Sequence, residues 1–236
     1  MNLTVRPILW IFSAVAIAIL LSLGTWQVKR LAWKNDLIAK VEARAAAEPV
    51  NVYEALALFE AGEDIEYLPV RVTGGFPSSD VAHVPGTYEG AIGAYAFQVM
   101  RLDEPSGRLL LLNRGFVPQD DRSNNYPLPS ADAVVGLVRS YDGNRGLAAA
   151  FAPPDRPSDL VFHSRDRGII SAALAPEGGE FLPFALDSML ATELPQGRTT
   201  RLAFRNSHLG YAITWYGLAA SLLFMVLAMS RGRRAQ

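Results

Sequence analysis

The sequence predicts a membrane protein in which two transmembrane helices flank an antiparallel β-barrel or sandwich-like domain that carries one short helix. Three observations support this fold class: a charge-free apolar run near each end of the chain, short alternating segments between the two runs, and tryptophans confined to the runs and their edges. Only 19% of the 236 residues are charged, against about 25% in an ordinary soluble domain.

The predicted transmembrane helices occupy residues 7–28 and 207–230, neither of which contains a charged residue. About 20 apolar residues span the hydrocarbon core as a helix, so both runs are long enough. A signal peptide remains the alternative for the first run, because Ser22 and Gly24 form a small-x-small pattern near its end. That run is longer than the usual apolar segment of a signal peptide, however, and Lys29 follows it directly.

The charge pattern predicts that both termini are cytoplasmic and that the central domain is extracytoplasmic. Residues 231–236 form a basic tail, and two spans place both termini on one side. The edges of the central loop are also basic, but the positive-inside rule applies mainly to short loops. Residues 29–205 contain all 23 acidic residues and carry a net charge of −5, which argues against a nucleic-acid partner.

Between the spans the pattern changes from helical to extended. Residues 29–48 have apolar positions at helical spacing and predict an amphipathic stalk helix that Pro49 ends. Residues 49–205 are then the predicted β-rich domain, in which 103–107 form a hairpin turn. Its predicted strands and its one predicted helix lie at 67–73, 95–102, 108–113, 133–140, 181–186 and, for the helix, 166–174.

Motifs of catalysis are missing from the sequence. The chain has no cysteine, no phosphate-binding loop and no hydrolase motif, so it is predicted not to be an enzyme. His83 follows Asp80 at a spacing that could hold a metal, but a solvated loop histidine is the favoured interpretation. His163 stands beside Ser164 and near Asp166, yet neighbouring side chains on a strand point to opposite faces and cannot form a triad.

The second span contains the residues with the strongest functional signal. On a helix, His208, Tyr211 and Trp215 share a face. A neutral imidazole there could be the axial ligand of a flat apolar ring system, with Arg201 and Arg205 just outside to pair with carboxylates. The alternative is that His208 is a polar anchor at the membrane interface and that the aromatic residues form an ordinary interfacial belt.

Two further patterns carry structural predictions. Small residues recur along one face of each span and are predicted to bring the two helices together. Gly115 is expected to adopt a positive φ or a tight strand exit, and Arg114 to pair with an acid of the domain. The small residues are Ala14, Ala18 and Ser22 in the first span and Gly210, Thr214, Gly217 and Ser221 in the second.

Three segments together resemble the surfeit locus protein 1 family of cytochrome c oxidase assembly factors. Residues 23–34 match a membrane exit with G-x-W-Q followed by R-x-x-W-K, and residues 206–216 match N-x-H-L-x-Y-A-x-T-W-Y. Residues 113–118 match N-R-G-W-V-P, with Phe116 in place of the tryptophan. The resemblance extends over the whole chain.

The resemblance implies an accessory factor in the biogenesis of haem–copper cytochrome c oxidase. Bacterial members are associated with binding haem a and delivering it to subunit I, which makes subunit I and haem a synthase the expected partners beside the lipid bilayer. His208 is the implied ligand of the haem iron. A scaffold that holds an oxidase intermediate without binding cofactor is the alternative. The residues expected around the cofactor are Trp26, Arg205, Tyr211 and Trp215.

The start of the chain bears on its location. The first apolar run begins near residue 7 and leaves no room for a mitochondrial transit peptide. A bacterial inner membrane is therefore the expected location, with the central domain in the periplasm.

Overall fold

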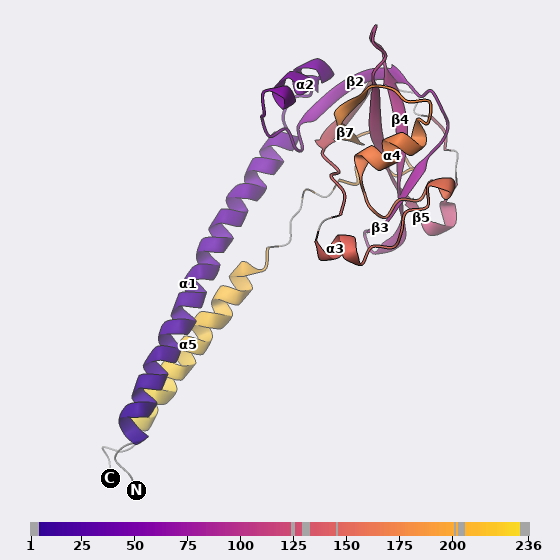
Figure 1. Cartoon of the computed structure of the whole chain (residues 1–236). Coiled ribbons are helices and arrows are strands. Elements are labelled where there is room, and N and C mark those ends of the chain that lie inside the picture. The colour runs from indigo at the N-terminus through magenta and orange to yellow at the C-terminus, as the bar shows by residue number, and fades with distance from the viewer. Residues whose placement is uncertain are drawn as a thin grey trace. The chain divides into compact units, whose positions relative to one another are not determined.

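The computed structural model describes residues 5–123, 126–128, 133–144, 146–200, 202 and 206–231. The chain divides into two compact units. One is a helical unit formed by Met1–Val41 and Leu202–Gln236, and the other is a β-rich unit formed by Glu42–Arg201 (Figure 1).

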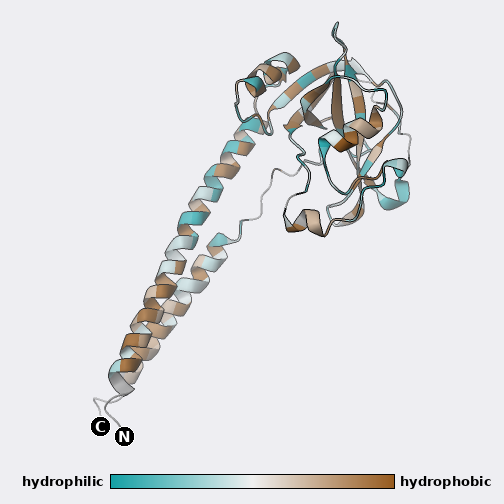
Figure 2. Ribbon diagram, in the orientation of Figure 1, coloured by the Kyte–Doolittle hydropathy of each residue, from teal (hydrophilic) through white to brown (hydrophobic). Residues whose placement is uncertain are grey.

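The helical unit consists of two long helices, α1 (Val5–Ala45) and α5 (His208–Arg231). Among the described residues, Pro7–Ala45 and His208–Met229 are long and apolar enough to cross a membrane, judged by length and composition. Figure 2 shows apolar colouring on the part of α1 nearer the N-terminus and along α5, with hydrophilic bands farther along α1. The predicted stalk is part of α1, which runs without a break until four residues before Pro49.

The β-rich unit is built on one seven-stranded sheet with the strand order β1-β2-β6-β7-β5-β4-β3. An additional pairing of β2 with β4 closes the five strands β2, β6, β7, β5 and β4 into a barrel. The strands are β1 (Val50–Asn51), β2 (Pro69–Gly75), β3 (Ala82–Tyr88), β4 (Ala91–Leu102), β5 (Leu109–Pro118), β6 (Ala133–Arg139) and β7 (Phe181–Ser188).

Most strand pairs are antiparallel, as predicted, but two are parallel: β1 with β2, and β5 with β7. All five predicted strands are present, and the β4–β5 hairpin turns at the predicted site. The predicted short helix is α4 (Arg167–Leu174), whose N-cap Asp166 accepts a hydrogen bond from the backbone N–H of Ile169 at 3.0 Å.

Six further elements lie in segments for which no helix or strand was predicted, and two of them are the strands β1 and β3. α2 (Val52–Glu60) is capped by Asn51, whose side chain accepts hydrogen bonds from the N–H groups of Tyr53 and Glu54. The others are a single helical turn, α3 (Leu147–Ala150), and two 3₁₀ turns, η1 (Gln119–Asp121) and η2 (Pro157–Asp159).

Alternating side chains of the barrel strands fill two hydrophobic clusters. The inner cluster contains Leu110 and Leu112 of β5 with Val52 and Ala55 of α2. The outer cluster contains Leu111 of β5 and is covered by α4. β5 is therefore apolar on both faces, which a central strand between two packed layers requires.

Candidate functional site

The two long helices meet along a seam with alternating spacings of three and four residues. On α5 the half-buried or buried positions are His208, Ala212, Trp215 and Ala219, followed by Leu222 and Val226. Positions three and four residues apart lie on one face of a helix, so these residues mark the face that each helix turns to the other. The half-buried or buried positions of α1 that keep this spacing are Ser13, Ile17, Leu20, Gly24, Gln27, Leu31, Lys34, Ile38 and Val41, and Ala16 and Leu23 beside them are half-buried as well.

The predicted contact between faces of small residues is wrong. Every one of those small residues is exposed, on α1 and on α5 alike. Instead, close approach occurs at Gly24, where an added Cβ would lie 2.9 Å from the ring of Tyr216. The heptad seam needs a small residue only where a large side chain crosses it, so a full stripe of small residues is not required.

Polar contacts cross the seam where His208 begins α5. The Nδ1 atom of His208 lies 2.7 Å from Oε1 of Gln27, which is buried on α1. The Asn206 amide donates to Oδ1 of Asn35 at 2.7 Å, on the side of His208 away from the apolar stretch.

The contact with Gln27 orients the His208 imidazole and selects its tautomer. A carbonyl oxygen can only accept, so Nδ1 is the donor in this contact, and in a neutral imidazole the free lone pair then lies on Nε2. Histidine ligands of metals are commonly held in this way, with one ring N–H donated to an oxygen acceptor and the other nitrogen left to bind. Nε2 has no hydrogen-bond partner within the described part of the chain.

The other predicted site residues do not surround His208 together. Trp215 is half-buried on the seam two turns from His208. Tyr211 is 54% exposed and Trp26 is 56% exposed, so both side chains point out of the helix pair. Arg201 and Arg205 lie outside the described residues. The pair therefore presents one oriented imidazole and one aromatic wall.

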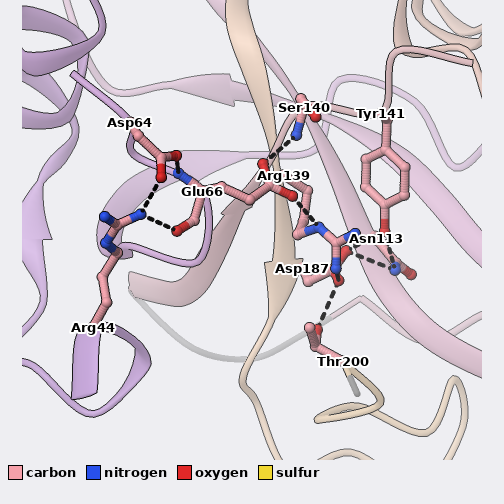
Figure 3. A network of polar contacts seen from close by, with 9 residues as sticks. All are labelled: Arg44, Asp64, Glu66, Asn113, Arg139, Ser140, Tyr141, Asp187 and Thr200. Atoms are coloured by element: carbon pink, nitrogen blue, oxygen red, sulfur yellow. Dashed lines mark hydrogen bonds and ion pairs between the residues drawn. The ribbon is translucent and has the colours of Figure 1, made fainter. Parts of the chain in front are cut away.

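A second polar site lies in the barrel around Asp187 at the end of β7. One carboxylate oxygen accepts hydrogen bonds from Asn113 at 2.8 Å and from Tyr141 at 2.5 Å, and the other accepts one from Thr200 at 2.7 Å. Burial raises the pKa of Tyr141 well above its usual value, and the charge of Asp187 acts in the same direction. The Tyr141 hydroxyl is therefore a permanent donor (Figure 3).

Arg139 links this site to the start of the β-rich unit. Its Nε lies 2.9 Å from Glu66, its Nη1 lies 3.8 Å from Asp187, and its guanidinium stacks over Tyr67 and Tyr141. Burial raises the pKa of Glu66, which the charge of Arg139 partly offsets. In Figure 3 the polar contacts continue from Glu66 to Arg44 and Asp64, near the end of α1.

The Asn113-Arg114-Gly115 motif has three separate structural roles. Asn113 donates to Asp187 and accepts from the N–H of Gly115 at 3.1 Å. Gly115 has the predicted positive φ of 129°, and a Cβ there would collide with the carbonyl oxygen of Gln196 at 1.9 Å.

The prediction for Arg114 is wrong. This guanidinium is buried, and it donates to Gln98 and to the carbonyl oxygen of Pro127. Neither partner is acidic, and no carboxylate pairs with Arg114 within the described part of the chain. Burial lowers the pKa of Arg114.

The favoured interpretation of His83 is also wrong, because this residue lies fully buried in β3. Its Nε2 is 3.1 Å from the hydroxyl of Tyr126. Burial lowers the pKa of His83 to about 4, and the charge of Arg122 acts in the same direction. Asp80 instead accepts a hydrogen bond from Ser78.

No metal cluster forms in the described residues. No three histidine, cysteine, aspartate or glutamate side chains of these residues lie together in a way that could hold an ion. The backbone N–H groups of His163 and Ser164 both donate to Asp155. That contact fixes a loop and assembles no nucleophilic triad.

Sequence comparison places the whole chain in a known family. A model described as the SURF1 family matches residues 14–220. Surfeit locus protein 1 of Homo sapiens is 32% identical over 228 residues, which cover 86% of this chain and 71% of the human protein. The Xenopus tropicalis protein of the same name is 29% identical over 92% of this chain and 73% of its own. The SURF1-like protein of Dictyostelium discoideum is 25% identical over 89% of this chain and 91% of its own. The chain therefore belongs to the SURF1 family.

Proposed function

We propose that this protein is a membrane-anchored accessory factor in the biogenesis of haem–copper cytochrome c oxidase, and that it binds haem a as cargo for subunit I. α1 and α5 would cross the bacterial inner membrane with both termini in the cytoplasm. The β-rich unit would lie in the periplasm. The protein would act without catalysing a reaction of its own, with subunit I and haem a synthase as partners.

The orientation of His208 carries this proposal. An ionisable side chain at a membrane helix is costly and faces protein, water or a ligand. Hydrogen bonds between membrane helices stabilise their packing by only about 0.6 kcal/mol on average. Helix packing alone is therefore a weak reason for a histidine at this position, whereas its partner Gln27 leaves the second ring nitrogen able to bind a metal.

The residues fit one axial ligand better than a closed pocket. His208 supplies the nitrogen through Nε2, and Trp215 supplies one flat apolar wall. Tyr211 and Trp26 are more than half exposed and leave the outer side of the helix pair open. A second copy of the chain or a partner subunit would complete the enclosure, and a second axial histidine would come from the same source.

The test is an absorption spectrum of the full-length protein purified in detergent from cells that also make haem a. Wild-type protein is expected to carry the pigment, and His208→Ala is expected to lose it while keeping its circular dichroism spectrum. Gln27→Leu removes the acceptor of the Nδ1 proton and should weaken retention without abolishing it. His163→Ala is the matched control and should retain the pigment. An unchanged spectrum in His208→Ala would exclude His208 as the ligand.

The scaffold function is the second candidate, and the exposed outer face of α5 favours it. Leu209, Ile213 and Phe224 are each more than half exposed and could contact helices of a partner as well as lipid. A photo-crosslinking residue at position 213, near Trp215 but on the exposed face, would then label subunit I although no haem co-purifies with the wild-type protein. That pair of results would replace the haem-binding proposal.

A further inference from the structure

A cavity of about 360 Å³ opens at the end of the barrel where the Asp187 site lies. This volume is within the range of small-molecule sites, which is about 300–1,000 Å³. Among the described residues, two guanidinium groups and one carboxylate line it, and four aromatic rings form much of its wall. The lining residues used below are Arg139, Arg165, Asp187, Thr199, Tyr67 and Tyr141.

The side-chain oxygens of Asp187 and Asn113 in this cavity already accept hydrogen bonds from the protein. Both oxygens of Asp187 accept hydrogen bonds from the protein, and its side chain is only 5% exposed. The amide oxygen of Asn113 accepts the N–H of Gly115. A cationic ligand would have to displace these donors, so the cavity has little capacity left for positive charge.

Some hydrogen-bond donors in the cavity, by contrast, are still able to bind a ligand. Arg139 is held by ion pairs: its Nε lies 2.9 Å from Glu66 and its Nη1 lies 3.8 Å from Asp187, while no acceptor is seen for its Nη2 within the described part of the chain. Arg165 is exposed, and one of its nitrogens donates to the carbonyl oxygen of Pro85 at 3.3 Å. Thr199 is only 5% exposed and lines the cavity beside these two arginines.

The backbone around the cavity is unusual as well. Three of its lining residues that are not glycine adopt left-handed conformations, with φ of 65° at Tyr67, 47° at Tyr141 and 54° at Arg165. Such conformations cost roughly 1–3 kcal/mol each and gather where side chains must be held in one direction. Here they present two aromatic rings and one guanidinium to the same space.

We propose that this cavity binds a small carboxylate with a flat apolar body, held by Arg165, Arg139 and Thr199 and packed between the tyrosine rings. A planar guanidinium matches a carboxylate in geometry and can donate two parallel hydrogen bonds to it. The four aromatic rings favour a flat apolar group over a hydrated inorganic anion. The proposal uses only the β-rich unit and does not depend on haem binding by His208.

The probe for the test is 4-fluorobenzoate, observed by fluorine NMR with the full-length protein in detergent and with empty micelles as the blank. A ligand of this size is expected to bind with a dissociation constant of about 1 mM. 4-Fluorobenzamide has the same shape without the charge and is expected not to bind. Arg165→Gln should weaken binding about tenfold, since one charge-assisted pair is lost.

Two further variants keep the test independent of folding defects. Thr199→Val removes a single hydroxyl and should weaken binding several-fold. Arg156→Gln is the matched control, because Arg156 is exposed, pairs with Asp159 and does not line the cavity. It should bind as the wild type does. Absence of binding by the wild-type protein, or unchanged affinity in both Arg165→Gln and Thr199→Val, would overturn the proposal.

A last comparison identifies the source of the carboxylate. N-acetyl-Gly-Phe with a free terminal carboxylate can be tested against its C-terminal amide. Tighter binding of the free acid than of 4-fluorobenzoate would assign the site to the C-terminus of a peptide. Weaker binding would assign it to a small metabolite.

Discussion

His83 couples the stability of the β-rich unit to pH. Burial lowers its folded-state pKa to about 4, with help from Arg122, whereas an unfolded chain has the ordinary value of 6.5. Above pH 6.5 the residue is neutral in both states and has no effect. As the pH falls from 6.5 to 4, the unfolded chain binds a proton that the folded chain does not, so stability is lost. The loss is expected to be about 3 kcal/mol by pH 4.

The measurement is hydrogen exchange of the buried β4 and β5 amides in the full chain, corrected for the intrinsic rate at each pH. The opening free energy should fall between pH 6.5 and 4 in the wild type and stay nearly level in His83→Gln. Tyr126→Phe removes the hydrogen bond at Nε2 and should lower stability by about 1 kcal/mol at every pH while the slope remains. A wild-type profile without slope would show that His83 is accessible to protons.

The error over His83 has a physical reason. The residues around it include Pro85 and Gly86, which favour turns, and no clear alternation marks β3. The strand exists because seven of its residues pair with β4, a partner that is recognisable only in three dimensions. Gly115 could be predicted, because glycine in a strand indicates a close backbone approach. The neutral partners of Arg114 could not, because Gln98 and Pro127 are distant in sequence.

The helix seam depends on small side chains at single positions. Ala219 is 3% exposed on the seam, whereas its neighbour Ala220 faces outward. Ala219→Leu should overpack the seam and weaken helix pairing by about 1–3 kcal/mol. Ala220→Leu adds the same atoms to the outer face and should have no effect on pairing. Weaker helix pairing in both variants, or in neither, would contradict the assignment of Ala219 to the seam.

Helix pairing in these variants can be measured by crosslinking two introduced cysteines, because the chain has no cysteine of its own. Asn35 and Asn206 are hydrogen-bonded across the helix pair at 2.7 Å, so cysteines at both positions would lie within reach of a short bismaleimide. The crosslinking yield then reports how often the helices are paired. We expect it to fall several-fold with Ala219→Leu and to stay at the reference level with Ala220→Leu.

At the level of elements, local sequence patterns predicted most helices and strands but not how the strands pair. Both long helices, five strands and α4 follow from charge-free runs, alternation and a capping aspartate. The parallel pairing of β5 with β7 and the closure of β2 on β4 do not, since each joins segments distant in the sequence. The Asp187 site was missed for the same reason. Its members Asn113, Tyr141 and Thr200 come from three separate segments and meet only in the folded barrel.

Across the whole molecule, the anchoring proposal is supported by where the tryptophans face. Trp10 and Trp26 are separated by 16 residues, which is about 24 Å along a helix, and both are at least half exposed. Aromatic rings that point outward at this separation suit the two interfaces of a bilayer. If α1 and α5 both span the membrane, the β-rich unit lies on the side opposite to both termini.

This topology predicts the labelling of two single cysteines in the otherwise cysteine-free chain. Glu177→Cys, in an exposed loop between α4 and β7, should react with a membrane-impermeant maleimide in intact spheroplasts. Ala235→Cys, in the basic tail, should react only after lysis. The reverse pattern would place the β-rich unit in the cytoplasm.

Mass spectrometry of the labelled chain checks the signal-peptide alternative. Cleavage after Gly24 would remove Trp10 and leave α5 as the only anchor. The tail would still be protected from the maleimide in that case, so labelling alone does not distinguish the two. An intact mass together with protection of the tail therefore requires that both helices cross the membrane.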